Sequence, residues 1–292
     1  MFDRLTTGLL LLISDRCHFD PHRYGLKQDD AILAEPEHGH LIEHCFRSFE
    51  GRLKLIAGGA TQNSIRTAQW VFDYYDRRQT LFLGTVGEDQ YAAQLEQQAR
   101  SDHVEPLYCK IRKPALDKNN NSRYIERFGD REDGRPVGKS VEKDRPDCFK
   151  TGVCLAFNTN NGLYRSMVTF LGAARQLNKS HVERYSDYVD RSSLVYCGGF
   201  LLSSSFDAVR KLGDYCHENN KKFALNLSAP YVCSNFGNLI AQLIPNLDLV
   251  FGNEKELREF AHYHHFKVGS LFCLNIEISS IVVTNTCTVF TD

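Results

Sequence analysis

The sequence predicts an α/β fold with three layers, in which a mostly parallel central sheet lies between helices and a small β lid lies beside it. Two observations support this class. From Leu53 onward, short apolar runs alternate with amphipathic stretches of helix length, as expected for parallel strands joined by crossover helices. In two stretches on either side of residues 113–147, apolar and polar positions alternate, which is typical of a sheet covered on one face. With 292 residues, of which 42% are hydrophobic, the chain can bury a substantial core.

The predicted strands and helices follow in order along the chain. Residues 90–102, 205–219 and 254–266 have the length and charge of helices that pack on a sheet. The apolar runs with the composition of strands are "LKLIAGG", "TLFLGTVG", "SLVYCGGFLL", "KFALNLSAP", "LDLVFGNE" and "SSIVVT".

The stretch "AGGATQNSIRTAQW", residues 57–70, joins the first of these runs to a further helix. Its apolar residues fall near a helical period, which places Gln62 and Asn63 at or near the helix start. Adjacent glycines adopt backbone angles closed to other residues and let a ligand approach the main chain closely. Gly58 and Gly59 are therefore expected to form either an ordinary tight turn or part of a ligand site.

Small or polar residues follow several of the predicted strands. In open α/β sheets ligands bind outside the carboxyl ends of the strands, although Gly and Asn also favour ordinary turns there. Five such clusters in one chain favour a ligand site: Gly58-Gly59, Gly84-Thr85, Gly198-Gly199, Asn226 to Ser228 and Gly252-Asn253.

The composition bears on the kind of ligand that the chain binds and on the cellular compartment. Lys plus Arg number 35 against 36 Asp plus Glu, a net charge of -1, so no electrostatic argument favours nucleic acid or an acidic membrane. Ten cysteines without a C-x-x-C pair fit free thiols in a reducing cytosol. The apolar run "GLLLLI" is too short for a signal peptide, and no stretch approaches the roughly 20 apolar residues of a membrane span.

A lid is predicted from "EPLYCKIR" and "TGVCLAFNTNNGLYRSMVTFLGAA", which alternate apolar and polar positions as antiparallel strands do. Between them, residues 113–147 are rich in charge, Asn, Gly and Pro, and predict a disordered surface insertion. The predicted division is a truncated or atypical first-strand region at 1–23, a lid at 24–50 and 108–172, and an α/β core at 51–107 and 173–292.

Five stretches occur in the order "GLKQDDAILAE", "AGGATQNS", "RSMVTFLGAA", "NLSAP" and "FGNEKE". Together they resemble the adenosine kinases, a branch of the ribokinase-type (PfkB) sugar kinases, over roughly residues 24–284. The resemblance implies a ribokinase-like fold. It also implies transfer of the γ-phosphate of ATP to the 5′-hydroxyl of adenosine, giving AMP in purine salvage, with Mg²⁺ as cofactor. The family implies a cytoplasmic monomer, with a nuclear pool as an alternative location.

The resemblance assigns the nucleoside site. Gly58 and Gly59 would leave room for the ribose, and Asn63, which has both a donor and an acceptor, would read its hydroxyls. An amide can also cap a helix, which is the alternative role of Asn63. Apolar walls suit an uncharged purine, and the residues that match the walls around the base are Leu33, Cys154, Met167, Leu171, Phe200, Leu201 and Tyr231.

The resemblance also assigns the phosphate site. Arg165 would reach the transferred phosphoryl group, where a cationic fork stabilises charge. Asn253 and Glu256 match the Asn-x-x-Glu motif that organises the water ligands of Mg²⁺. Asn226, in "NLSAP", is assigned to the ATP side of the site.

Two departures from the family pattern limit the expected activity. The motif Gly-Ala-Gly-Asp, which supplies the general base and an anion hole, has no match up to Asp292. At the other end Leu12 stands where the family has a ribose-binding carboxylate, and Asp15 lies three positions on. The connection 268–280 is also shorter than the family's. We therefore expect a core that lacks its C-terminal part and impaired or absent turnover, unless Asp15 or Asp248 serves as the base.

Three hypotheses remain open at this point. The sequence is an incomplete adenosine kinase, a catalytically inactive nucleoside-binding relative, or another ribokinase-type sugar kinase. The third is the least favoured, because "NLSAP" points to the adenosine branch.

Overall fold

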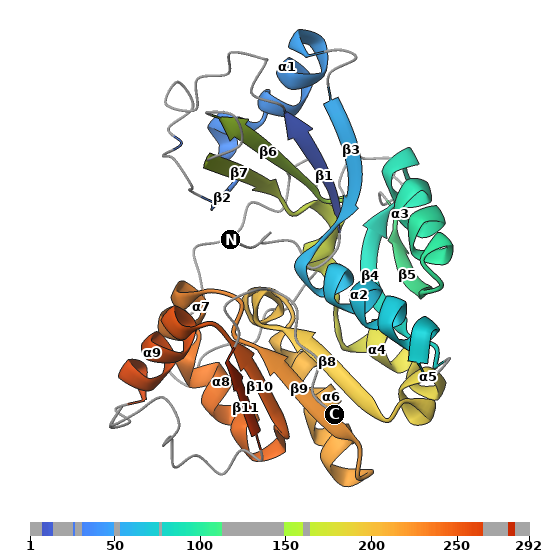
Figure 1. Ribbon diagram of the computed structural model, residues 1–292, viewed down its shortest axis with the longest axis vertical. Helices are drawn as coiled ribbons and strands as arrows, with labels where there is room; N and C mark the ends of the chain where they lie inside the picture. The colour runs from blue at the N-terminus through green and yellow to red at the C-terminus, as the bar shows by residue number, and fades with distance from the viewer. Residues whose placement is uncertain are drawn as a thin grey trace, which may run out of the picture.

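A computed structural model of the chain describes residues 8–13, 26, 31–49, 53–75, 78–112, 149–159, 164–264 and 280–283. The described strands form sheets of five, four and two strands. Figure 1 shows the five-stranded sheet at the top, the four-stranded sheet at the bottom and the two-stranded sheet at the right. The predicted insertion at 113–147, Asp15 and most of the connection 268–280 lie outside the described residues.

The five-stranded sheet forms the lid, with the strand order β2-β7-β6-β1-β3. β1 lies between β3, to which it is antiparallel, and β6, to which it is parallel, and β6 and β7 are antiparallel neighbours. The helix α1 and the short 3-10 helix η3 connect β2 to β3. The bounds are β1 Gly8–Ile13, β2 Ala31–Leu33, η3 Pro36–His38, α1 Leu41–Ser48, β3 Leu53–Gly58, β6 Val153–Thr159 and β7 Tyr164–Phe170.

The two faces of the lid sheet differ, because successive side chains of a strand point to opposite faces. On β6, Leu155 and Phe157 pack with Leu41 of α1 in one buried cluster. Cys154 belongs to a second cluster with Met167 of β7. One face is therefore covered by α1, and the other face contributes to the joint between the lid and the rest of the molecule.

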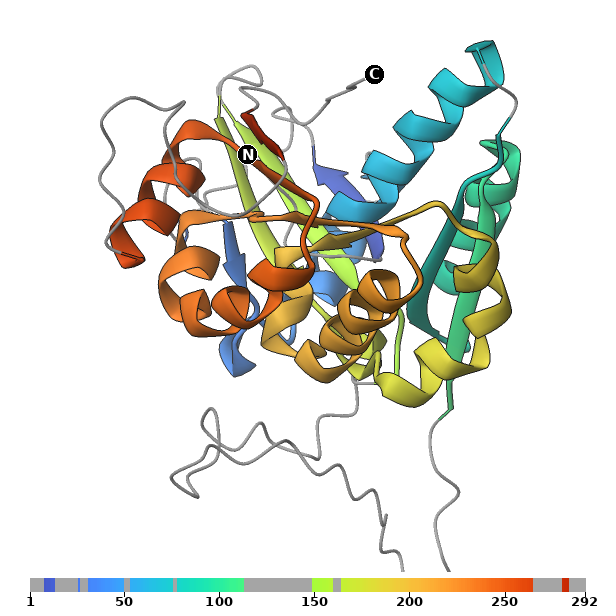
Figure 2. The ribbon, with the colours of Figure 1, turned by 90° about the horizontal axis from the view of Figure 1, so that it is seen from below.

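The four-stranded sheet forms the core and is parallel throughout, in the order β11-β10-β9-β8. Its strands alternate with helices along the chain, as the sequence predicts, and α6 and α9 correspond to the helices predicted at 205–219 and 254–266. Figure 2 shows α2 and α6 on opposite sides of this sheet. The bounds are β8 Leu194–Gly198, η5 Gly199–Ser203, α6 Phe206–Glu218, β9 Lys222–Asn226, α7 Pro230–Asn235, α8 Gly237–Leu243, η6 Ile244–Asn246, β10 Leu249–Gly252, α9 Glu254–Tyr263 and β11 Ser280–Val283.

The two-stranded sheet pairs β4, Leu81–Gly87, with β5, Glu105–Ile111, in parallel, and α3, Gln90–Ser101, connects them. This arrangement corrects one prediction, since "EPLYCKIR" was expected to be an antiparallel strand of the lid. The burial of consecutive residues along β5 explains the difference: residues 106–109 are all buried, as in a strand covered on both faces. The strand β3 was assigned to the core, whereas the structure pairs it with β1 in the lid sheet.

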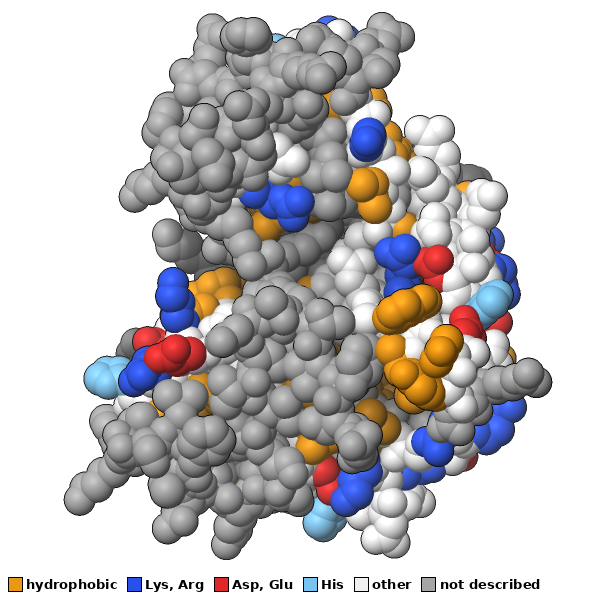
Figure 3. All heavy atoms as spheres, in the orientation of Figure 1, with side chains coloured by type: hydrophobic (Ala, Val, Ile, Leu, Met, Phe, Trp, Pro, Cys, Tyr) orange, Lys and Arg blue, Asp and Glu red, His pale blue; other side chains and the backbone are white. Residues whose placement is uncertain are grey.

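Helix α2, Ala60–Tyr75, begins directly after Gly59, where the sequence predicts a helix start. Its C-terminal half carries three exposed aromatic residues, Trp70, Tyr74 and Tyr75. Figure 3 shows hydrophobic side chains gathered over this helix. Among the described residues no helix combines the length and the apolar character that crossing a membrane requires.

A compact joint connects the lid to β4. The hydroxyl of Thr151 donates to Asp89 Oδ1 at 2.7 Å and accepts from the Gly87 N–H at 3.0 Å. The N–H of Thr151 donates to Asp89 Oδ2 at 2.7 Å, and Asp89 also caps α3. The short elements that lead from the lid into the core are η4 Gly172–Gln176, α4 Lys179–Arg184 and α5 Ser186–Arg191.

Candidate functional site

The Gly-Gly pair lies between the end of β3 and the start of α2. Gly58 is the last residue of β3, and Gly59 has a φ of 109°, a left-handed value that residues with a side chain rarely adopt. The carbonyl of Gly59 accepts from the N–H of Asn63 at 2.8 Å. Asn63 is exposed on the first turn of α2. The three residues assigned to the ribose are thus adjacent at one strand-to-helix turn.

A second turn lies where β8 and β9 end. The N–H of Gly199 donates to Ser228 Oγ at 2.9 Å, and Asn226 Oδ1 accepts from the Ser228 N–H at 2.7 Å. Ser228 has a φ of 67°, which this side-chain turn supports. The amide oxygen of Asn226 therefore holds the turn, and its assignment to the ATP side stays a prediction.

A small pocket lies where the lid, the connecting segment and the core meet. Leu33 from β2 and Leu171 face Phe200 of η5 and Tyr231 of α7 across it. The rings of Phe200 and Tyr231 are stacked, with centroids 6.3 Å apart and an angle of 24° between their planes. The free volume is only about 20 Å³, which is too small for a nucleoside. The remaining lining residues are Ala174, Arg175, Ser203 and Ser204.

Three other residues assigned to the walls around the base do not line this pocket. Cys154 and Met167 are buried behind it in the cluster against which Leu171 packs, and the hydroxyl of Thr169 lies 3.4 Å from the Cys154 sulfur. Leu201 packs against the core cluster instead. The structure therefore brings together four of the seven assigned residues, and the other three support the pocket from behind or lie beside it.

Arg165 lies on β7 directly opposite Asn158 of β6. Its Nε donates to Asn158 Oδ1 at 3.2 Å, and the residue is exposed. The lid sheet thus presents a guanidinium at its surface, and its role toward a phosphoryl group stays a prediction.

Asn253 and Glu256 form a capping box at the start of α9. Asn253 Oδ1 accepts from the Glu256 N–H at 3.0 Å. In return, the backbone N–H of Asn253 donates to Glu256 Oε2 at 3.0 Å, and its side-chain Nδ2 donates to Glu256 Oε1 at 2.7 Å. Glu256 is buried, and this burial raises the pKa of its carboxyl. Helix capping accounts for the pair without a metal, and the described residues contain no group of three or more His, Cys, Asp or Glu side chains placed to hold a metal ion.

The structure also places the residues considered as substitutes for the general base. Asp248 precedes β10, at the opposite end of the sheet from Asn253, and it accepts from Lys222 Nζ at 2.6 Å and from the Phe223 N–H at 2.9 Å. Burial raises the pKa of Asp248, but these two donors outweigh burial and leave the pKa below its usual value. An ion-paired carboxylate at that end is poorly suited to accept a proton at the nucleoside site. The position of the family's ribose-binding carboxylate is occupied by Leu12, which lies in β1 opposite Lys54.

Comparison with known proteins fits this arrangement. The sequence pattern of the pfkB family of carbohydrate kinases matches residues 24–126 and 144–270. The chain belongs to the pfkB family. Adenosine kinase 2 of Arabidopsis thaliana is 29% identical over 261 residues, and the adenosine kinase of Saccharomyces cerevisiae is 30% identical. Both matches cover 89% of this chain and 64% of the relative, so the chain spans a little under two thirds of their length.

Solved structures show that this pfkB protein has the ribokinase-like α/β fold that the sequence predicts. The Anopheles gambiae adenosine kinase in complex with P1,P4-di(adenosine-5) tetraphosphate is 24% identical with a TM-score of 0.66, covering 91% of this chain and 69% of the other. The Schistosoma mansoni adenosine kinase in complex with 2-fluoroadenosine is 23% identical with a TM-score of 0.67, covering 89% and 64%.

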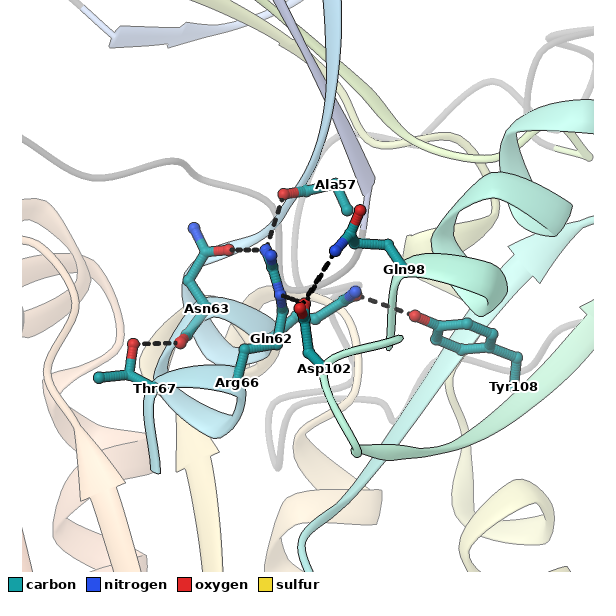
Figure 4. Close-up of polar contacts among 8 residues, drawn as sticks. All are labelled: Ala57, Gln62, Asn63, Arg66, Thr67, Gln98, Asp102 and Tyr108. Atoms are coloured by element: carbon teal, nitrogen blue, oxygen red, sulfur yellow. Dashed lines mark hydrogen bonds and ion pairs between the residues drawn. The ribbon is translucent and has the colours of Figure 1, made fainter. Parts of the chain in front are cut away.

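Sequence reasoning missed a set of polar contacts behind the Gly-Gly turn of this pfkB protein. Arg66 of α2 bonds Asp102, at the end of α3, with Nε to Oδ2 at 2.5 Å. Nearby, the buried Tyr108 hydroxyl donates to Gln62 Oε1 at 3.0 Å, and burial raises the pKa of Tyr108. Arg66 and Asp102 are 36 residues apart, and no local pattern in the sequence links them. Figure 4 shows these side chains converging from α2, α3 and β5.

Proposed function

We propose that this chain binds adenosine between its lid and its core and serves the adenosine kinase reaction, in which the γ-phosphate of ATP passes to the 5′-hydroxyl of adenosine to give AMP. The observation that carries the proposal is the pocket in which Leu33 and Leu171 face the stacked rings of Phe200 and Tyr231. Apolar and aromatic walls suit an uncharged purine. The names of the relatives support adenosine as the nucleoside.

The ribose would lie against the turn from β3 to α2. Gly59 bears no side chain and has a left-handed backbone, which keeps that approach open, and Asn63 is exposed beside it. The 5′-hydroxyl would then point toward the phosphoryl group that Arg165 of the lid is proposed to reach.

The ATP side would use Asn226, Asn253 and Glu256. Both carboxylate oxygens of Glu256 already accept from Asn253, so the pair fits Mg²⁺ only through water molecules, which can donate to the remaining lone pairs. When bound, Mg²⁺ would supply charge neutralisation at the phosphates. The protein residues would fix the position of the water shell.

A calorimetric titration tests the nucleoside, and a transfer assay tests the reaction. We expect the titration with adenosine to show heat of binding at a stoichiometry of one adenosine per chain, and we expect no heat of binding with ribose or fructose. With γ-³²P-labelled ATP and Mg²⁺, any label that is transferred should appear in AMP and depend on adenosine. Binding of ribose or fructose without adenosine, or label in a sugar phosphate, would overturn the proposal in favour of another sugar kinase. The impaired or absent turnover expected from the sequence stays a prediction.

We further propose a monomer in the cytoplasm, with a nuclear pool as the alternative location. The cysteines that the structure describes are all buried free thiols, which supports a reducing compartment. Equilibrium sedimentation and fractionation of cells check these two points.

A further inference from the structure

Arg66 connects the ribose-side turn to a fixed point on the neighbouring helix. Its Nη1 donates to the carbonyl of Ala57 at 3.1 Å and lies 3.4 Å from Asn63 Oδ1, at the long end for a hydrogen bond. Its Nε bonds Asp102. One guanidinium therefore contacts the end of β3, the first turn of α2 and the end of α3, as Figure 4 shows.

Asp102 is itself held in place. Both of its carboxylate oxygens accept from Gln98 Nε2, at 3.1 and 3.2 Å, and its N–H donates to carbonyls in the last turn of α3. The side chains of Arg66 and Asp102 are 24% and 29% exposed, so the pair is partly shielded from water. A planar guanidinium carries its donors on separate nitrogens and can reach acceptors on different sides at once, whereas all the donors of lysine share one nitrogen.

This arrangement decides which end of the Asn63 amide faces the ligand. A guanidinium can only donate, so the amide oxygen must face Arg66 and the amide nitrogen must point the other way. In Figure 4 the nitrogen of Asn63 points away from Arg66. Within the described part of the chain this nitrogen donates to no protein atom. The group left for a ligand is therefore a donor.

We propose that Arg66, held by Asp102, is a positioning residue that fixes Asn63 so that its amide nitrogen donates to a hydroxyl oxygen of the nucleoside ribose. The inference rests on the proposed function and adds a specificity to it. Asn63 would recognise a ribose oxygen as an acceptor, and a deoxynucleoside without that oxygen would leave the amide N–H unpaired.

The test is a double-mutant cycle on adenosine affinity, measured by calorimetry with the 292-residue chain. Arg66→Lys keeps the charge beside Asp102 but cannot reach all three acceptors. We expect it to raise the Kd for adenosine on the order of tenfold, the weight of one hydrogen bond. In an Asn63→Ala background the same change should have no further effect, because residues that act through one another are not additive.

Arg100→Lys is the matched control, since Arg100 is an exposed arginine on α3 that pairs with Glu96 and Glu105. The Kd of Arg100→Lys for adenosine should equal that of the wild type. A second ligand, 2′,3′-dideoxyadenosine, gives the readout that a merely structural role would not move. The wild type should prefer adenosine over this analogue, and Arg66→Lys should lose most of that preference.

Three results would overturn the inference while leaving the proposed function intact. They are an unchanged Kd in Arg66→Lys, an equal loss in the Asn63→Ala background, and an equal loss for adenosine and its dideoxy analogue. A wild-type chain that binds no adenosine would instead overturn the proposed function, and this inference with it.

Discussion

At the scale of single residues, Gly59 shows how a backbone angle fixes a side-chain choice. Its φ of 109° lies where a Cβ is strained by about 1–2 kcal/mol. The sequence already singled out this position, because a Gly-Gly pair before a helical stretch is visible without a structure.

Gly59→Ala should therefore lower the stability by that amount and raise the Kd for adenosine at least about tenfold, because both the backbone and the ribose approach change. Gly39→Ala is the control, since Gly39 has an ordinary φ of -56°. Calorimetry and thermal melts measure both effects. An unchanged affinity in Gly59→Ala would remove Gly59 from the site.

Glu256 gives a prediction about pH. Burial raises the pKa of its carboxyl in the folded state, so the stability from the protonated group is fully present below the unfolded pKa and is lost as the pH rises through the folded pKa. Glu256→Gln has no carboxyl at this position, so its stability lacks this contribution to the pH dependence. The melting temperature of the wild type minus that of the variant should fall as the pH rises above the ordinary carboxyl pKa of about 4. A difference that stays constant over this range would contradict the raised pKa.

The walls around the base show what residue-level resemblance can and cannot place. Leu33, Leu171, Phe200 and Tyr231 line one pocket, whereas Leu201, half-buried on the same short helix as Phe200, does not line it. Apolar composition is the same for a pocket wall and a core position. The distinction depends on which face of a short helix meets the lid, and the sequence contains no signal for it.

At the scale of elements, local patterns predicted what is local. The helices expected at 90–102, 205–219 and 254–266 are confirmed as α3, α6 and α9 within a few residues at their ends. They could be predicted because apolar spacing and capping depend on residues that are close together in the sequence. The sequence assigned β3 to the core and β5 to the lid, and the strands to which they pair contradict both assignments. A strand's partner is chosen by tertiary packing, and a short apolar run looks alike in a parallel core and in a lid.

The start of α9 allows a structural role to be separated from a functional one. Asn253 caps α9 and Asn178 caps α4, each through its side-chain oxygen. Replacing either by Ala should cost about 1 kcal/mol of stability. Only Asn253→Ala should also weaken the binding of Mg·ATP, by roughly tenfold, because only this cap lies at the carboxyl edge of the core sheet. Equal affinities in the two variants, measured by calorimetry, would leave Asn253 a cap and nothing more.

At the scale of the whole molecule, the lid meets the two-stranded sheet at β4 through a few specific contacts. An added Cβ at Gly87 would lie 2.4 Å from the Phe149 carbonyl and 2.7 Å from the Thr151 nitrogen, so the chain segments at this joint approach as closely as glycine allows. The hydroxyl of Thr151 completes the joint between Asp89 and Gly87. None of these long-range contacts was predicted, since they join residues more than sixty positions apart.

Thr151→Ala should lower the free energy of unfolding by about 1–3 kcal/mol, because it leaves the buried Gly87 N–H without an acceptor. Thr151→Ser keeps the hydroxyl and should remain near the wild type. Urea denaturation of the three proteins measures the difference. Equal losses in the Ala and Ser variants would show that the methyl group, and not the hydroxyl, holds the joint.

A crystal structure of the chain with adenosine would show whether the nucleoside binds between the lid and the core. We expect a lid moved away from its present position, with adenine between Leu33 and the stacked rings of Phe200 and Tyr231. The ribose should lie on Gly59, with the amide nitrogen of Asn63 on a ribose oxygen. Adenosine bound elsewhere in the molecule, with this pocket still closed, would contradict the account.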